Sequence, residues 1–240
     1  MSHHIFKKII LVGRPAAGKS EVIDFIKRTP LEERIRRFHI GEIVEFDDFL
    51  YVWQTFEDDD IWDKKLHKPR KNTSSDYYFY DHDIWNFFIH KINLAYAKEI
   101  ARNKNLHETH TALIEFSRGG ENGFAEAFSH LSDEILKDAG IVYISVSYEE
   151  SVRKNRRRFR PEMADSILYH SLPDDKMEFY YKTNDWEKIS NNQPSGYINI
   201  KGHNVPFVVL YNEPEVTDSD SKLGPALEKV FRELHNKFSK

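Results

Sequence analysis

The chain has 240 residues, of which 40% are hydrophobic and 31% are charged, a composition typical of a folded domain and not of a disordered chain. It contains no cysteine, which excludes disulfides, thiolate metal sites and cysteine nucleophiles. The 35 Lys and Arg residues nearly balance the 39 Asp and Glu residues, so attraction of nucleic acid by overall charge is not expected. No apolar run is long enough to span a membrane and the N-terminus lacks the apolar core of a signal peptide, so we expect a cytoplasmic protein without a membrane partner.

Short apolar runs alternate with segments of helical period along the chain. In chain order, we predict a strand at 9–12, a helix at 20–29, an extended segment at 37–46, a helix at 83–103, a strand at 111–116, a helix ending near 138, a strand at 141–146, a helix at 148–160, a helix at 174–189, a hairpin of strands at 197–200 and 205–211, and a helix at 225–238. This alternation predicts an α/β fold, a three-layer sandwich with a mostly parallel central sheet, as one domain over 1–240.

Residues 49–82 stand apart because they follow neither period and are dense in aromatic and acidic side chains. So long a segment without secondary structure is uncommon in a compact domain, and we predict a functional insertion over the active face. Aromatic rings can stack on flat ligands, and acids can bind sugar or amine groups. The candidates for such contacts are Trp53, Tyr80, Asp81 and Trp85, with packing inside the insertion as an equal alternative.

The most specific motif follows the first predicted strand. Residues 13–20 match the pattern G-x-x-x-x-G-K-[ST] in full, between a buried strand and an amphipathic helix. Its glycines allow backbone N–H groups to point at phosphate oxygens, Lys19 would reach the β- and γ-phosphates, and Ser20 would bind Mg²⁺. A plain glycine turn with a surface lysine would not need this context. The predicted nucleotide-binding residues here are Gly13, Arg14, Pro15, Ala16, Ala17, Gly18, Lys19, Ser20 and Glu21.

This loop resembles the Walker A loop of P-loop proteins. The order of the predicted elements resembles the branch that contains adenylate, shikimate and gluconate kinases. The layout extends over most of the chain, but only the phosphate loop is a specific motif. The resemblance implies ATP and Mg²⁺ as cofactors, and a nucleoside triphosphate and a small-molecule acceptor as partners. It also implies an acceptor-binding insertion at 49–110, a lid at 153–185 and an adenine-holding loop at Asn212.

Three carboxylates follow or lie within predicted strands. Asp47 and Asp48 close the second extended segment, where parallel strands face the ligand crevice, and a carboxylate there can accept a proton or hold a water on Mg²⁺. Glu115 lies inside a buried strand, where an unpaired charge is costly. Similar kinases carry acids at both places, so either Asp48 or Glu115 is the predicted base. A helix cap and a structural salt bridge are the respective alternatives.

Basic residues gather on the helix predicted from Tyr148. Arg153, Arg156, Arg157 and Arg160 share one helix face, and like charges at this spacing repel one another unless an anion is present. In the kinases that the chain resembles, lid arginines at this position close over the triphosphate. A solvated charged face and a nucleic-acid patch are the alternatives.

The sequence therefore predicts an ATP- and Mg²⁺-dependent phosphotransferase that acts on a small-molecule acceptor, with a nucleoside or nucleotide among the candidates. A nucleotide hydrolase, a non-catalytic nucleotide sensor and a kinase acting on nucleic-acid ends stay open as alternatives. The predicted catalytic residues are Lys19, Asp48, Glu115, Arg118, Arg153 and Arg157. The predicted metal site consists of Ser20, Asp47 and Asp48.

Overall fold

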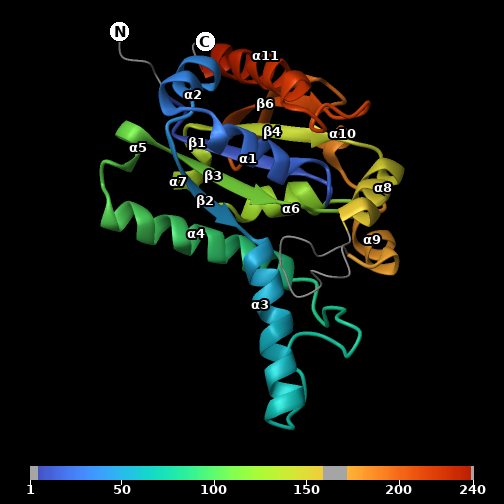
Figure 1. Ribbon diagram of the computed structural model, residues 1–240. Helices are drawn as coiled ribbons and strands as arrows, with labels where there is room; N and C mark the ends of the chain where they lie inside the picture. The colour runs from blue at the N-terminus through green and yellow to red at the C-terminus, as the bar shows by residue number, and fades with distance from the viewer. Residues whose placement is uncertain (1–4, 159–171, 239–240) are drawn as a thin grey trace.

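A six-stranded sheet runs through the centre of the computed structural model, which describes residues 5–158 and 172–238 (Figure 1). The strands lie in the order β2-β3-β1-β4-β6-β5, and only β5 is antiparallel to its neighbour. Their bounds are β1 Lys8–Gly13, β2 Glu42–Asp47, β3 His110–Phe116, β4 Ala139–Ser145, β5 Ser195–Ile200 and β6 His203–Tyr211. This arrangement confirms the predicted α/β fold, the mostly parallel sheet and the β5–β6 hairpin.

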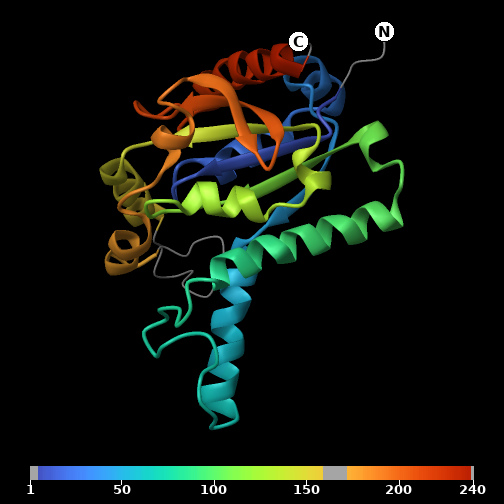
Figure 2. The ribbon, with the colours of Figure 1, turned by 180° about the vertical axis from the view of Figure 1, so that it is seen from behind.

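Helices cover both faces of the sheet, as Figures 1 and 2 show from opposite sides. Alternate residues of β1 enter different cores: Ile9 and Leu11 pack with α1, α2 and α11, and Ile10 and Val12 pack with α4, α6 and α7. The helix bounds are α1 Lys19–Arg28, α2 Leu31–Phe38, α4 Ile84–Arg102, α6 Gly123–His130, α7 Asp133–Leu136 and α11 Asp220–Phe238. A strand buried on both faces explains the continuous apolar run of β1 and gives the predicted three-layer sandwich.

The prediction that residues 49–82 lack regular structure is wrong in its first half. Helix α3 runs over Phe49–Asp60 and continues as a π-helical turn, η1, over Ile61–Lys65. It projects from the body of the molecule, and the chain returns beside it (Figures 1 and 2). Most residues of α3 are only half-buried, and such a helix needs no continuous apolar stripe, so its sequence shows no helical period.

Several predicted boundaries also move. The helix predicted to end near 138 is the pair α6 and α7, and β4 begins at Ala139, so Gly140 lies inside a strand instead of ending a helix. A Cβ at Gly140 would come within 2.9 Å of Leu234 Cδ2, and the residue is therefore small because α11 packs there. The predicted helix at 174–189 is α9 Asp174–Tyr181 and α10 Trp186–Ile189, and α11 starts five residues before Pro225.

The start of α8 is as predicted, and its described part is Tyr148–Arg158. The Glu150 backbone N–H donates to the Ser147 hydroxyl at 3.1 Å, which is one half of a capping box. The prediction that this helix ends near 160 lies outside the described residues. The short helix α5 Leu106–Thr109 was not predicted, and α2 extends to Phe38, where an extended segment was expected. In the described ranges, no helix has the length and apolar character needed to cross a bilayer.

Candidate functional site

The phosphate loop connects β1 to α1 and is fixed by close backbone contacts. Gly18 adopts a left-handed conformation with φ of 114°. A Cβ at this position would come within 2.7 Å of Asn212 Nδ2 and 2.9 Å of Thr217 Cγ2, so only glycine fits both the conformation and the space. Ser20 is exposed at the start of α1, where the first backbone N–H groups of the helix have no intrahelical partners.

Lys19 is a buried cation, with only 7% of its surface exposed. Its Nζ donates to Ser117 Oγ at 2.6 Å and to the Arg14 carbonyl at 3.2 Å, and lies 3.8 Å from Glu115 Oε1. Burial lowers the pKa of Lys19, while Glu115 opposes this effect. A phosphate would supply the negative charge that a buried ammonium lacks. The residues present therefore fit a nucleotide, with Lys19 on its phosphates.

The predicted carboxylates meet at the ends of β2 and β3, since Asp47 pairs in register with Glu115. Burial, followed by the charges of Glu115 and Asp48, raises the pKa of Asp47 to about 8. Burial also raises the pKa of Glu115, against the effect of Lys19. Among the described residues, no three His, Asp or Glu side chains are arranged to hold a metal ion by themselves. A magnesium ion would therefore need phosphate oxygens and water as well as Ser20.

Asp48 and Arg118 form a buried ion pair, with Arg118 Nη1 2.5 Å from Asp48 Oδ2. Arg118 also donates to the carbonyls of Ser117 and Trp85, at 2.7 and 2.9 Å. Burial raises the pKa of Asp48, and the charge of Arg118 opposes the rise. Both residues were predicted site residues, and each holds the other in place beside the phosphate loop.

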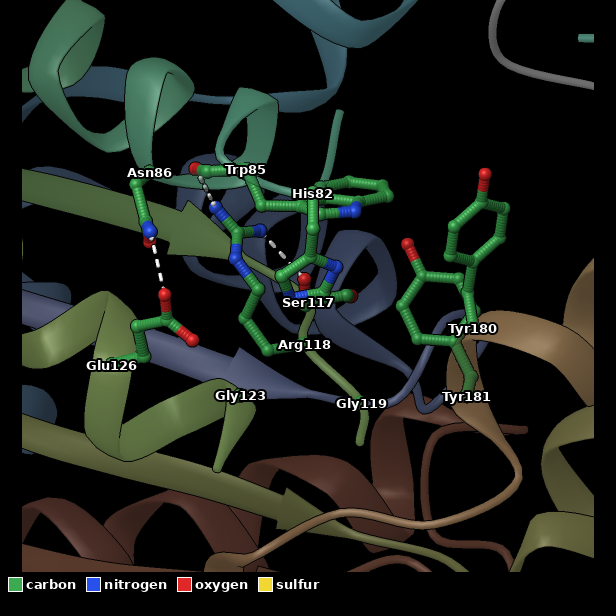
Figure 3. Close-up of a pocket in the computed structure, with 10 residues that line it drawn as sticks. All are labelled: His82, Trp85, Asn86, Ser117, Arg118, Gly119, Gly123, Glu126, Tyr180 and Tyr181. Atoms are coloured by element: carbon green, nitrogen blue, oxygen red, sulfur yellow. Dashed lines mark hydrogen bonds between the residues drawn. The ribbon is translucent and has the colours of Figure 1, made fainter. Parts of the chain in front are cut away.

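A cavity opens beside this pair (Figure 3). Its lining consists of His82, Trp85, Asn86, Ser117, Arg118, Gly119, Gly123, Glu126, Tyr180 and Tyr181. Ser117 belongs to this wall and accepts the hydrogen bond from Lys19, so the cavity adjoins the phosphate loop. Trp85 is the one aromatic candidate of the four insertion residues that lines it; Trp53, Tyr80 and Asp81 do not.

Glu126 and Asn86 were not predicted as site residues. Asn86 Nδ2 donates to Glu126 Oε1 at 2.6 Å, across the gap between α4 and α6. In the sequence, each is a polar residue within a helical segment, next to apolar neighbours. This pattern indicates a polar contact but does not indicate which cavity the residue lines.

Acidic side chains of the same chain pair with most of the described arginines on the arginine face of α8. Arg153 lies 2.6 Å from Glu150 and 3.3 Å from Glu215, and Arg157 lies 2.6 Å from Glu215. Arg153 thus binds mainly to Glu150 of α8 itself, and Arg157 binds to Glu215 in the loop after β6. The contact of both arginines with a triphosphate stays a prediction. Arg160 lies outside the described residues, as does the part of the predicted lid at 159–171.

Arg158, which was not predicted, lies nearer to the phosphate loop. Its Nη2 is 2.8 Å from Glu21 Oε1, and its charge acts on both Lys19 and Glu115. The sequence could have indicated it, since Arg158 follows the predicted arginine face directly. To predict Arg158 as a site residue, one must know which side of α8 faces the phosphate loop, and the sequence does not specify this.

Asn212 is completely buried and braces the phosphate loop. Its Nδ2 donates to the Ala17 carbonyl at 2.7 Å, and its Oδ1 accepts from the backbone N–H groups of Val216 and Thr217 at 2.7 and 3.1 Å. Arg14 also fastens the loop, since its Nη1 donates to the Tyr181 carbonyl of α9. Both residues thus hold the phosphate loop in place through contacts with other parts of the protein.

No protein-family model matches the chain, and no curated protein matches it. Solved structures with similarity include TT1252 from Thermus thermophilus, at 13% identity over 96% of this chain and 98% of that one, with a TM-score of 0.47. Kti12 from Chaetomium thermophilum, in complex with ADP-AlF3, has 14% identity over 95% and 98% and a TM-score of 0.47. Shikimate kinase from Acinetobacter baumannii, in complex with shikimate, has 13% identity over 99% and 97% and a TM-score of 0.42.

This chain itself shows the sheet order and a phosphate loop between β1 and α1. A parallel sheet with helices on both faces and a complete phosphate-loop motif after its first strand together define the architecture. The chain has a three-layer α/β fold with a P-loop motif after its first strand.

Proposed function

We propose that the chain is an ATP- and Mg²⁺-dependent phosphotransferase that acts on a hydroxyl group of a small molecule. The observation that carries this proposal is the position of Ser117. Its hydroxyl binds the phosphate-loop lysine on one side, and the same residue lines the cavity on the other. A phosphate held by Lys19 and an acceptor in the cavity would thus be neighbours, which is the requirement of direct transfer.

The nucleotide would be held by the backbone N–H groups of residues 13–20 and by Lys19. Bound Mg²⁺, with Ser20 as a ligand, would neutralise charge on the phosphates. Arg158 would add positive charge on the same side of the loop. The cavity wall supports an acceptor-binding role for 49–110, which supplies Trp85 and Asn86, and a lid role for 153–185, which supplies Tyr180 and Tyr181.

Asp48 and Glu115 are the candidate proton acceptors. Asp48 is held by Arg118, which lines the cavity, and Glu115 is held near Lys19. Replacing the base with its amide should lower kcat and leave KM nearly unchanged, because the base acts mainly in the transition state. Comparison of Asp48→Asn with Glu115→Gln therefore assigns the role.

Two alternatives have less support. A kinase of nucleic-acid ends would use the arginine face of α8, and Glu150 and Glu215 already neutralise Arg153 and Arg157 on it. A sensor that binds nucleotide without chemistry would not require an acceptor cavity beside Lys19.

The test is ADP release with ATP, Mg²⁺ and pools of candidate acceptors. We expect release that depends on one pool, and at least a hundredfold lower kcat in Lys19→Ala, since a lost charge contact to the transition state costs roughly 10²–10³-fold. Lys27→Ala is the matched control, because Lys27 lies on the same helix and pairs with Glu45 at the surface. Equal release without any acceptor would instead indicate a hydrolase, and bound ATP without release would indicate a sensor.

A further inference from the structure

The polar groups of the cavity point to the chemistry of its occupant. Three charged side chains line it or touch its wall: Arg118, Asp48 and Glu126. Arg118 and Asp48 neutralise each other at 2.5 Å. Glu126 has no cation within ion-pair distance among the described residues, and its hydrogen-bond partner is the neutral Asn86. The charge left in the cavity is therefore negative.

The charge of Arg118 is balanced by Asp48. Both Nη1 hydrogens are used, by Asp48 and the Ser117 carbonyl, and one of the two Nη2 hydrogens is used by the Trp85 carbonyl. Its Nε has no partner, but this atom is buried away from solvent. The guanidinium also lies over the Trp85 ring, with Cζ 5.2 Å from the ring centroid. Arg118 therefore forms part of the wall, and releasing it would expose Asp48 as an unpaired buried charge.

Hydrogen-bond acceptors remain available at Asn86 and Glu126, which line the same cavity. Asn86 must donate its Nδ2 to Glu126, because a carboxylate only accepts, and this fixes the amide so that its Oδ1 is left as an acceptor. Glu126 keeps its second oxygen, Oε2, as well. Figure 3 shows this pair on one side of Arg118, with Tyr180 and Tyr181 on the other. An occupant that supplies N–H donors would satisfy both oxygens, and an anionic occupant would satisfy neither and would be repelled by Glu126.

We propose that the acceptor is an alcohol that carries amine or amide N–H groups and no phosphate or carboxylate, and that Glu126 with Asn86 selects it. This inference rests on the proposed function, because it names the substrate class of the same site. It separates this cavity from sites built for anionic acceptors, which need unpaired arginine or lysine side chains.

Calorimetric titration of the full chain with matched probes, without ATP, tests the inference. The pairs are adenosine with AMP, cytidine with CMP, and glucosamine with gluconate. We expect each nitrogen-bearing neutral or cationic member to bind at least ten times more tightly than its anionic partner. We also expect Glu126→Gln to reduce this preference at least tenfold, while its amide oxygen still accepts the bond from Asn86. Glu121→Gln, an exposed change just before α6, is the control and should leave the preference intact.

Tighter binding of the anionic members, or no binding by any nitrogen-bearing probe, would overturn the inference. If Glu126→Gln keeps the melting temperature of the wild type and also its preference for the nitrogen-bearing neutral or cationic probes, Glu126 does not select the acceptor. The proposed function fails separately. Nitrogen-bearing probes that bind but release no ADP in the presence of ATP would refute phosphoryl transfer, while the chemistry of the cavity would stand.

Discussion

At the scale of single residues, the site is built from groups whose burial works against their charge. Lys19 is nearly inaccessible to solvent, and Asp47, Asp48 and Glu115 all have raised pKa values for which burial is the first cause. Groups of this kind gain stability from a ligand that restores the missing charge balance. The energetic cost of assembling the site should therefore be visible in the unliganded protein.

For Asp47, this cost should depend on pH. Its folded-state pKa of about 8 is far above the ordinary value near 4, so the folded protein keeps a proton that the unfolded chain loses. Between these pH values the native state binds more protons, and the free energy of unfolding falls as pH rises. We expect Asp47→Asn to stabilise the protein at pH 8.5 by roughly 1–3 kcal/mol and much less at pH 5. Urea unfolding at both pH values measures the difference.

Asp24→Asn is a suitable control for this experiment, because Asp24 is an exposed carboxylate that pairs with Arg28 on α1. A stabilisation by Asp47→Asn that is equal at pH 5 and pH 8.5 would show that titration of Asp47 is not its cause.

At the scale of elements, the arm formed by α3 and its return segment has its own internal support. Asp59 is completely buried near the far end of α3. Its carboxylate accepts from the backbone N–H groups of Lys71, Asn72 and Thr73 and from the Thr73 hydroxyl. Burial opposes ionisation, but these hydrogen bonds lower the pKa of Asp59. One side chain thus ties the returning segment to the helix.

We expect Asp59→Ala to release the returning segment while leaving the sheet intact, because all four bonds are lost outside the main core. Amide hydrogen exchange should accelerate at least tenfold over residues 66–75 and stay unchanged in β1 and β3. Asp58→Ala, at the exposed neighbouring position, is the control. Faster exchange throughout the protein would show that the arm is part of the main cooperative unit.

A second element-scale contact joins α8 to the loop after β6. Glu215 lies 3.0 Å from Lys154, which is almost completely buried, and also pairs with Arg153 and Arg157. Burial opposes ionisation, but the hydrogen bonds from Arg157 and Lys154 bring the pKa of Glu215 down to about 2. This carboxylate holds α8 against the segment that braces the phosphate loop.

Glu215→Gln should lower the free energy of unfolding by about 3 kcal/mol, because Lys154 would remain as a buried cation without a carboxylate. Chemical denaturation at neutral pH measures this loss. Glu213→Gln provides the comparison, since Glu213 is exposed and makes a hydrogen bond with the Ser147 N–H. A loss below about 0.5 kcal/mol would mean that solvent reaches Lys154 and compensates its charge.

At the scale of the whole molecule, one sheet separates two apolar cores. Phe128 of α6 belongs to one core and Phe231 of α11 to the other, and both are about 99% buried, with 1% of their surface exposed. Because β1 contributes alternate residues to both cores, we expect the two layers to unfold together.

Phe128→Ala and Phe231→Ala should each lower the free energy of unfolding by about 3–5 kcal/mol, within a single transition. Phe179→Ala, at a position with 70% exposure, should change it by less than about 0.5 kcal/mol. Denaturation followed by fluorescence and by circular dichroism checks both points. Separate transitions by the two probes would show that the layers are independent.

The sequence by itself determined the features that depend on neighbouring residues. The phosphate loop is one, because its glycines, Lys19 and Ser20 must follow one another to surround a phosphate. The buried strands are another, because a strand covered on both faces has to be apolar throughout. The sequence also predicted the carboxylates at the ends of β2 and β3, since parallel strands bring their carboxyl ends to one edge.

Only the tertiary structure decided which distant side chains meet. Asp48 and Arg118 are 70 positions apart, and Asn86 and Glu126 are 40 apart. Their contacts depend on strand order and on the rotation of each helix, and local periodicity specifies neither. The same holds for α8, where the sequence identified the arginines but not Glu215 as their partner. Helix α3 was missed because a helix is recognised from the apolar face that it buries, and Asp59 is the one fully buried residue of α3.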